Sequence, residues 1–150
     1  MFISFEGIDG SGKSTQARML AEALRAEGRR VTLTREPGGS PGAEEIRRLV
    51  LEGDPDRWSA ETEILLFTAA RRDHLERTIL PALAAGHIVI TDRFADSTRV
   101  YQGAMRDQFD DIRDFDAQTN IDAIGGRRAL TDELHRLIIG RAPDLTFLID

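Results

Sequence analysis

The stretch Gly7-Ile-Asp-Gly-Ser-Gly-Lys-Ser-Thr15 decides the fold of this chain. It matches the pattern G-x-x-x-x-G-K-[ST], whose glycines let successive backbone N–H groups turn into one anion-binding concavity at the start of a helix. The apolar run from Phe2 to Phe5 is typical of a strand, and Leu20, Ala21 and Leu24 continue an apolar stripe with helical spacing. A strand, a loop and a helix therefore follow one another, the setting in which this pattern binds a nucleoside triphosphate.

Every residue of this loop is a candidate for contact with the nucleotide. We expect Lys13 to reach the β- and γ-phosphate oxygens, and the hydroxyl of Ser14 to face Mg²⁺. A glycine-rich turn without a ligand is the alternative, and the strand and helix on either side argue against it. The candidates are Gly7, Ile8, Asp9, Gly10, Ser11, Gly12, Lys13, Ser14 and Thr15.

Composition bounds the class of protein. A chain of 150 residues fits one domain, and 41% hydrophobic with 31% charged residues is ordinary for a soluble one. No apolar run approaches the roughly 20 residues of a membrane span, and there is no cysteine. Because the first residues already predict a strand, we expect no leader peptide. We therefore expect a cytoplasmic protein that does not bind a membrane. The net charge of −6 argues against a nucleic-acid partner.

Four strand-like segments recur along the chain, with helical patterns between them. They are Phe2 to Glu6, Arg30 to Thr34, His87 to Asp92 and Asp144 to Asp150. This alternation predicts the α/β class, a doubly wound parallel sheet flanked by helices. A glycine follows each helical pattern, as at a helix C-terminus; these are Gly28, Gly53, Gly86 and Gly140.

Three segments depart from this regular alternation of strands and helices. The helical stretch from Ser59 to Ala85 contains Pro81, which must either kink it or begin a new helix near Leu80. The acidic tract at 106–116 predicts a solvated surface excursion, with a metal site as the alternative. The segment from Asp144 to Asp150 predicts a buried core strand; because no helix follows to cover it, we expect a truncated domain.

The third strand-like segment ends in charged residues. Asp92 closes an apolar run, so it is expected beside the phosphate loop, where it can hold Mg²⁺ directly or through water. The alternative is that Asp92 caps the next helix. Arg93 follows, and a guanidinium at this end of a strand can form a fork for a second phosphate.

Further arginines lie where a second substrate can reach them. Arg35 ends the second strand, Arg47 lies on the next helix, and Arg71 and Arg72 lie on the long helix. Phe67 shares a helical face with Arg71, so the ring can stack on a base while the guanidinium bonds its edge. Core packing with solvated charges is the alternative for each, but a kinase needs several cations around two anionic substrates.

The motifs resemble the bacterial thymidylate kinase family in order and spacing, over almost the whole chain. They are Phe5-Glu-Gly-Ile-Asp-Gly-Ser-Gly-Lys-Ser-Thr15, Thr34-Arg-Glu-Pro-Gly-Gly39, Glu44-Glu-Ile-Arg47, Phe67-Thr-Ala-Ala-Arg71, Asp92-Arg-Phe94, Asp96-Ser-Thr98, Tyr101-Gln-Gly103 and Pro143-Asp-Leu-Thr146. The resemblance implies a nucleoside monophosphate kinase fold. It also implies transfer of the γ-phosphoryl group of ATP to dTMP with Mg²⁺, giving dTDP and ADP, by a homodimer.

The resemblance also implies roles for individual residues. Phe67 would stack on thymine; Arg71, Thr98 and Gln102 would meet its polar edge; and Tyr101 would crowd the sugar 2′ position. The acceptor phosphate would be held by Arg93, Arg47 and Arg35, and the acceptor cleft lined by Glu36 and Pro37, the latter after a cis bond. Asp9 would face the acceptor's 3′-hydroxyl or the water shell of Mg²⁺, with a turn-stabilising role as the alternative. The catalytic set is then Lys13, Arg93 and Asp9.

The chain departs from the family pattern in places. Phe94 stands where tyrosine or histidine is usual, and Arg99 replaces a small residue. Residues 104–126 are expected to form a local insertion. The family's basic lid and adenine-binding segment would follow Asp150, and Gly10 leaves the loop without the arginine that some relatives carry there, so we expect this chain to turn over weakly or not at all.

Two alternatives stay open at this point. One is another deoxynucleoside monophosphate kinase, which a preference for dGMP or dCMP over dTMP would establish. The other is a non-catalytic nucleotide-dependent switch protein. The residue after Gly7 is Ile8 rather than the lysine that partition ATPases require, and no Asn-Lys-x-Asp motif is present for a switch GTPase.

Overall fold

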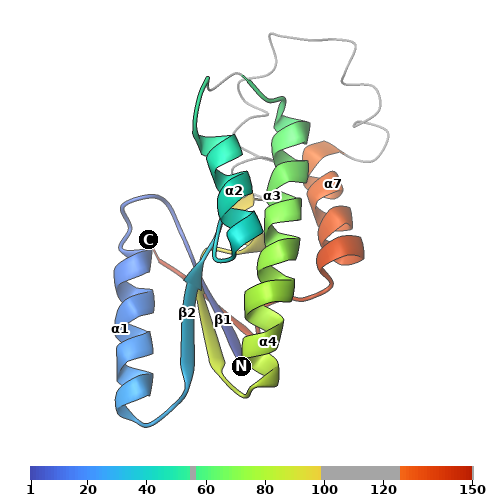
Figure 1. Cartoon of the computed structure of the whole chain (residues 1–150). Helices are drawn as coiled ribbons and strands as arrows, with labels where there is room; N and C mark the ends of the chain where they lie inside the picture. The colour runs from blue at the N-terminus through green and yellow to red at the C-terminus, as the bar shows by residue number, and fades with distance from the viewer. Residues whose placement is uncertain (55–56, 99–125, 150) are drawn as a thin grey trace.

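The computed structural model describes residues 1–54, 57–98 and 126–149 (Figure 1). Four parallel strands of this part form one sheet in the order β2-β3-β1-β4. The strands are β1 (Phe2–Glu6), β2 (Val31–Arg35), β3 (Ile88–Asp92) and β4 (Leu145–Leu148). Each of the four lies within a predicted segment or one residue from it, and the α/β class with a parallel sheet is confirmed.

Helices supply the crossover connections that parallel strands require. Figure 1 shows α1 on one side of the sheet and α3, α4 and α7 on the other, the doubly wound arrangement. The helical segments are α1 (Lys13–Ala26), α2 (Pro41–Leu51), α3 (Ala60–His74), η1 (Leu75–Ile79), α4 (Leu80–Ala84), α5 (Ala95–Thr98), α7 (Gly126–Leu134) and η3 (His135–Ile139).

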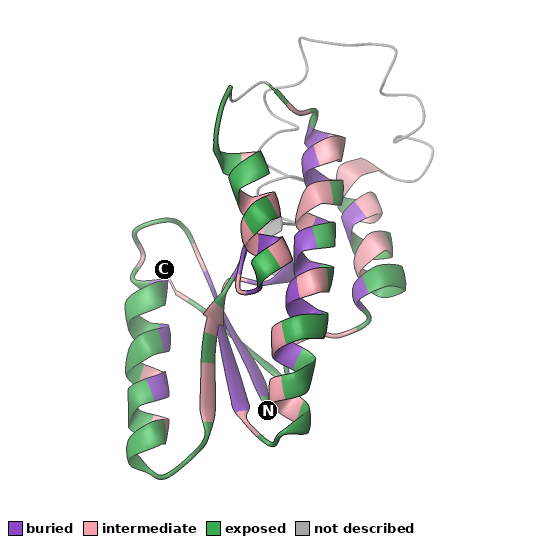
Figure 2. Ribbon diagram, in the orientation of Figure 1, coloured by how far each residue is buried: buried purple, intermediate pink, exposed green. Residues whose placement is uncertain are grey.

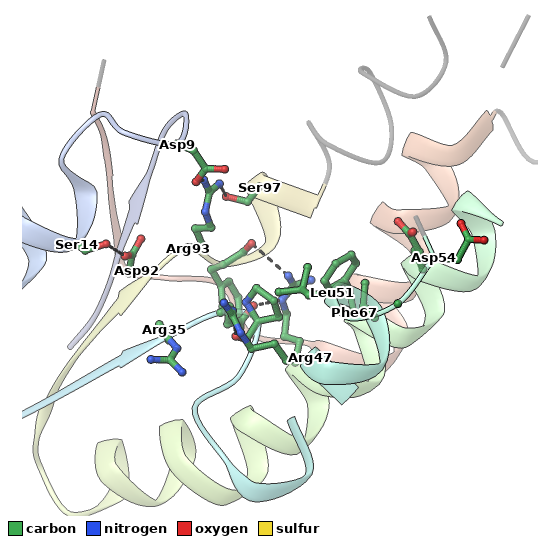
Figure 3. A pocket seen from close by; sticks show the side chains of 17 residues that line it. Asp9, Ser14, Arg35, Arg47, Leu51, Asp54, Phe67, Asp92, Arg93 and Ser97 are labelled. Atoms are coloured by element: carbon green, nitrogen blue, oxygen red, sulfur yellow. Dashed lines mark hydrogen bonds and ion pairs between the residues drawn. The ribbon is translucent and has the colours of Figure 1, made fainter. Parts of the chain in front are cut away.

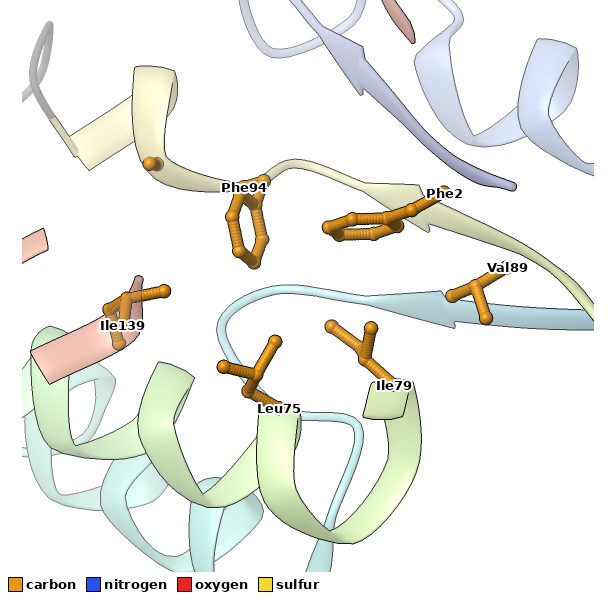
Figure 4. Close-up of a cluster of buried hydrophobic side chains, with 7 residues drawn as sticks. Phe2, Leu75, Ile79, Val89, Phe94 and Ile139 are labelled. Carbon is orange, nitrogen blue, oxygen red and sulfur yellow. The ribbon is translucent and has the colours of Figure 1, made fainter. Parts of the chain in front are cut away.

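Two apolar cores lie on opposite faces of the sheet, because successive side chains of β1 point in opposite directions. On one face, Ile3 and Phe5 pack with Ala17, Ala21, Ile88 and Ile90, which places α1 over the sheet. On the other, the second core contains Phe2, Leu75, Ile79, Val89, Phe94, Ala95 and Ile139 (Figure 4). The central strands β1 and β3 are consequently buried almost throughout (Figure 2).

The long helical stretch is continuous but not uniformly α-helical. Ser59 caps α3, where its hydroxyl oxygen accepts a hydrogen bond from the backbone N–H of Thr62 at 3.2 Å. After α3 the backbone makes a π-helical turn, η1, and then returns to α-helix in α4. Pro81 lies in the first turn of α4, a position where proline is common because its fixed φ suits the start of a helix. Of the two predicted outcomes, the proline begins a new helical segment.

The prediction that the last strand is buried is wrong for the described chain. Its side chains are exposed: 44% for Leu145, 38% for Phe147 and 72% for Leu148. The reason is its position, because β4 pairs only with β1 at one edge of the sheet, and no helix of the described chain covers it. The acidic tract at 106–116 and nearly all of 104–126 lie outside the described residues. Within residues 1–54, 57–98 and 126–149, no helix combines the length and apolar character needed to cross a membrane.

Candidate active site

The phosphate loop lies between β1 and α1, in the predicted strand-loop-helix setting. Gly7 adopts φ +144°, and a Cβ there would lie 2.1 Å from the carbonyl oxygen of Ile149, so the loop needs glycine at this position. Lys13 is buried at the start of α1, and its Nζ donates to the carbonyl oxygen of Ile8 at 2.5 Å. The lysine is thus held inside the loop, where its charge is directed at any anion bound there.

Asp92 meets the phosphate loop because β1 and β3 are paired in register, with Phe5 opposite Asp92. The Ser14 hydroxyl donates to Oδ2 of Asp92, while the buried Oδ1 has no hydrogen-bond partner within the described residues. A hydroxyl and a carboxylate with an unsatisfied oxygen fit Mg²⁺, which prefers oxygen ligands and often uses one or two carboxylates together with substrate phosphates. No larger group of His, Cys, Asp or Glu with metal-binding geometry occurs in the described part of the chain.

Arg93 has an unusual backbone and a fixed side chain. Its φ is +74°, in the left-handed region that non-glycine residues rarely adopt, and its N–H donates to the carbonyl oxygen of Phe5 at 2.9 Å. Its Nη2 donates to Oδ1 of Asp9 at 2.6 Å, and its Nη1 to Oγ of Ser97 at 2.9 Å. The guanidinium therefore lies against the phosphate loop.

Glu6 supports the backbone around Arg93. This buried carboxylate at the end of β1 accepts hydrogen bonds from the backbone N–H of Phe94 at 2.7 Å and from the hydroxyl of Ser97. Glu6 lies within the first motif of the sequence, but the sequence alone predicted no role for it. Its position at the carboxyl end of a central strand was the available signal.

One cavity of about 770 Å³ opens between the phosphate loop and the helices α2 and α3 (Figure 3). It contains residues predicted for both substrates. The lining consists of Asp9, Ser14, Arg35, Glu36, Pro37, Arg47, Val50, Leu51, Gly53, Asp54, Glu63, Phe67, Arg71, Asp92, Arg93, Phe94 and Ser97.

Arg71 lies in the wall of this cavity with its side chain 5% exposed. Its Nε donates to Oε2 of Glu36 at 2.7 Å, and its Nη2 donates to the carbonyl oxygen of Phe94 at 3.2 Å. The guanidinium carbon lies 5.2 Å from the centre of the Phe94 ring. Phe67, one turn before Arg71 on α3, is partly buried and also lines the cavity (Figure 3).

The loop after β2 also lines the cavity, next to Arg71. The Glu36–Pro37 peptide bond is cis, as expected. Nη1 of Arg47 donates to the carbonyl oxygen of Pro37 at 2.8 Å, which ties α2 to the loop. Arg35 is more exposed, with 60% of its side chain accessible, and pairs with Glu44 at 3.2 Å.

Glu44 is a supporting residue that sequence reasoning did not assign. Its carboxylate accepts the backbone N–H of Gly39 at 3.0 Å, and this hydrogen bond, with Arg35 and Arg47 nearby, lowers the pKa of Glu44 below its ordinary value. An ionised Glu44 therefore holds the loop of Pro37 and Gly39 against the start of α2.

The other predicted residues are those outside the described chain and one that bonds elsewhere. Tyr101 and Gln102 lie outside the described residues, as does Arg99, and Thr98 is described only as the last residue of α5. Arg72 bonds instead to Glu76 and to the carbonyl oxygen of Ile138. Lining residues missed from the sequence include Leu51, Asp54, Glu63 and Ser97, because neither charge pattern nor spacing separates them from ordinary helix and loop residues.

The sheet order, the phosphate loop and the adjoining cavity define a phosphate-loop α/β protein of the nucleoside monophosphate kinase type. A family model described as thymidylate kinase matches residues 5–115. The chain belongs to the thymidylate kinase family.

Several proteins and a solved structure are similar to this chain. It is 71% identical over 150 residues to thymidylate kinase of Ruegeria pomeroyi and 70% identical over 148 residues to that of Dinoroseobacter shibae. These alignments cover 100% and 99% of this chain, which spans 63% of the length of each relative. The crystal structure of thymidylate kinase from Ehrlichia chaffeensis superposes with a TM-score of 0.81 at 41% identity, covering 100% of this chain and 75% of that one.

Proposed function

We propose that this chain carries the acceptor site and phosphate loop of an enzyme that transfers the γ-phosphoryl group of ATP to dTMP, giving dTDP and ADP. The observation that carries the proposal is the cavity of about 770 Å³ that joins the phosphate loop to a wall of arginines and an aromatic ring. A donor and an acceptor bound at its two ends would be held close to each other in one cavity. Membership of the thymidylate kinase family supports this assignment of the acceptor.

On the donor side, the backbone N–H groups of the loop at 7–15 and Lys13 would bind the phosphates of ATP. Ser14 and Asp92 would hold Mg²⁺, which supplies charge neutralisation between the β- and γ-phosphates when bound. Lys13, already turned into the loop, would stabilise the charge that develops on the transferring phosphoryl group.

On the acceptor side, Phe67 would stack on the thymine ring and Arg71 would bond its polar edge. Arg93, Arg47 and Arg35 would hold the acceptor phosphate, and Asp9, paired with Arg93, would meet the 3′-hydroxyl or the water shell of Mg²⁺. Arg93 contacts the loop that holds the donor, so it would orient the acceptor for in-line attack. Glu36 and Pro37 would line the cleft, and Thr98, Tyr101 and Gln102 would complete it at the base and the sugar.

We also propose a homodimer in the cytoplasm. Self-association is supported by Leu65, an apolar residue on the long helices whose exposed fraction is 53%. It is also supported by the resemblance to the thymidylate kinase family, which implies a homodimer. Sedimentation equilibrium would give twice the chain mass of 16.7 kDa. A monomer over the whole accessible concentration range would remove this part of the proposal.

The experiment that tests the acceptor is calorimetric titration of the folded chain with dTMP, dUMP, dGMP and dCMP. Because the chain spans 63% of the length of its relatives, binding is a more direct measurement than turnover. Saturable binding that prefers dTMP is expected. Preference for dGMP or dCMP would assign the site to another monophosphate, and ATP hydrolysis that responds to a protein partner but to no monophosphate would favour a switch protein.

A further inference from the structure

Behind the cavity, a line of polar side chains connects β2 to α3. Nε2 of His74 lies 2.7 Å from Oγ1 of Thr34, and its Nδ1 lies 3.1 Å from Oε1 of Glu36. The other oxygen of Glu36, Oε2, accepts from Nε of Arg71 at 2.7 Å. His74 is 0% exposed and, unlike Glu36 and Arg71, does not line the cavity.

The direction of these hydrogen bonds follows from their chemistry. A carboxylate paired with an arginine only accepts, so Nδ1 of His74 carries the hydrogen and donates to Glu36. Nε2 then meets the Thr34 hydroxyl, which can donate or accept. The ring is consequently fixed at both nitrogens, and Glu36 is fixed at both oxygens.

Burial of this network is costly, which argues that it has a use. An ion pair and an imidazole are removed from water here, and apolar side chains of similar volume commonly stabilise a fold as well or better. The chain after the cis peptide bond also passes close to the ring: a Cβ on Gly39, whose φ is +87°, would lie 2.4 Å from Nε2 of His74. The backbone is therefore shaped around this histidine.

We propose that His74 is a positioning residue that fixes the guanidinium of Arg71 in the cavity wall through Glu36. This inference rests on the proposed function, in which Arg71 bonds the polar edge of the base. Without the donor at Nδ1 of His74, the carboxylate of Glu36 keeps only its contact with Arg71 and can rotate. Its Oε2 atom, which accepts from Nε of Arg71, then moves, and the guanidinium is no longer fixed.

Two substitutions separate positioning from packing. In His74→Asn the side-chain amide can replace Nδ1 and still donate to Glu36. In His74→Gln the longer amide replaces Nε2 near Thr34 and leaves Glu36 without its donor. We expect His74→Gln to weaken dTMP binding about threefold to tenfold and His74→Asn less than about twofold, since the contact with the base is weakened through Glu36 and not removed.

A ligand without a base provides the control. Binding of 2-deoxyribose 5-phosphate should be the same in wild type, His74→Asn and His74→Gln, because Arg71 has no base edge to meet. Equal losses of dTMP affinity in both variants, or a parallel loss with 2-deoxyribose 5-phosphate, would reduce His74 to a packing residue and overturn the inference.

A measurement without nucleotide distinguishes failure of this inference from failure of the proposed function. The Nε–H signal of Arg71 in a ¹⁵N spectrum, assigned by its loss in Arg71→Lys, should be sharp and slow to exchange in wild type and in His74→Asn. It should broaden or vanish in His74→Gln. An unchanged signal there would overturn the positioning role, whichever monophosphate the cavity binds.

Should His74→Gln not fold, Thr34→Val supplies the test, since it removes the hydroxyl that fixes the ring and keeps both His74 and Glu36. Faster exchange of the Arg71 Nε–H is expected, and no change would count against the proposal.

Discussion

Arg93 combines a left-handed backbone with a side chain held between Asp9 and Ser97. This geometry fixes the guanidinium where it is proposed to bind the acceptor phosphate. Replacing Arg93 with alanine keeps a Cβ at the same φ and removes the rest of the side chain, including the guanidinium. We expect at least about a tenfold loss of dTMP affinity, since one charge-assisted contact to a phosphate is removed. Calorimetric titration measures the loss.

The matched control for this arginine is Arg136→Ala, because Arg136 is 67% exposed on η3, where it pairs with the neighbouring Glu133. Its dTMP affinity should equal that of wild type. Equal affinities of Arg93→Ala and wild type would place Arg93 outside the acceptor site.

Asp92 gives a prediction for the metal. In Asp92→Asn the side chain loses its negative charge and one carboxylate oxygen becomes an NH2 group, so the gain in ATP affinity on adding Mg²⁺ should fall about tenfold. Affinity measured in EDTA should change little, because the backbone of the phosphate loop is intact. An undiminished Mg²⁺ effect in Asp92→Asn would show that the metal is held elsewhere.

At the scale of single residues, the sequence predicted the site residues whose positions follow from their immediate neighbours in the chain. Asp92 and Arg93 follow a buried strand directly, so parallel pairing alone brings them to the phosphate loop. His74 and Glu6 could not be assigned in this way. Their partners lie 38 and 88 positions away in the chain, and only the packing of α3 and α5 against the sheet brings them together.

At the scale of elements, the start of α2 depends on a side chain from α3. Asp73 accepts from the hydroxyl of Ser40 at 2.6 Å and from the backbone N–H of Ala43 at 3.2 Å, and it pairs with Arg77 at 2.8 Å. The hydrogen bond from Ser40 is the main cause that lowers the pKa of Asp73, with Arg77 acting in the same direction. An ionised Asp73 thus ties the two helices that frame the cavity.

This lowered pKa predicts an acid dependence of stability. A carboxyl whose pKa is lower in the folded state stabilises the fold fully above its ordinary pKa, and the stabilisation is lost as the pH falls through the folded value. Asp73→Asn should therefore cost about 1 kcal/mol at neutral pH and show a shallower decline from about pH 6 to about pH 3. Urea unfolding across this range measures both effects.

An exposed carboxylate on α1 supplies the comparison for Asp73. Glu22→Gln should leave the unfolding free energy and its pH dependence close to those of wild type. A decline in Asp73→Asn as steep as that of wild type would show that other carboxylates account for the acid sensitivity.

The boundaries of the elements followed largely from sequence periodicity. The strands were predictable because apolar runs bounded by glycine have few alternatives. The π-helical turn η1 was not, since the segment at 75–79 has the same residue types as an ordinary helix. Its side chains Leu75 and Ile79 both enter the second core, and this tertiary packing is absent from any local pattern.

For the whole molecule, the second core joins distant parts of the chain. Phe2 from the first strand and Phe94 after β3 meet edge to face at 5.1 Å, and Ile139 from η3 packs in the same cluster with Leu75. Leu75→Ala should cost about 2 to 5 kcal/mol of unfolding free energy, because a fully enclosed side chain leaves a cavity. Chemical unfolding gives the value.

Leu137→Ala on η3 is the comparison, because this leucine is 61% exposed. Its cost should stay below about 1 kcal/mol. Similar costs at both positions would mean that the core on this face of the sheet is not the part that limits stability. The exposed side chains of β4 illustrate why burial was harder to predict than strand position: an apolar run predicts a strand, but its neighbours determine how much of it is covered.

The left-handed backbone of Arg93 has a consequence for directed evolution. A non-glycine residue in this conformation costs roughly 1 kcal/mol, whereas its ion pair with a largely solvated Asp9 returns little of that in stability. Variants screened for heat resistance alone should therefore accumulate glycine at position 93, and those screened for binding of a nucleoside monophosphate should retain arginine. The residue found at position 93 would therefore show which of the two selections a laboratory population had undergone.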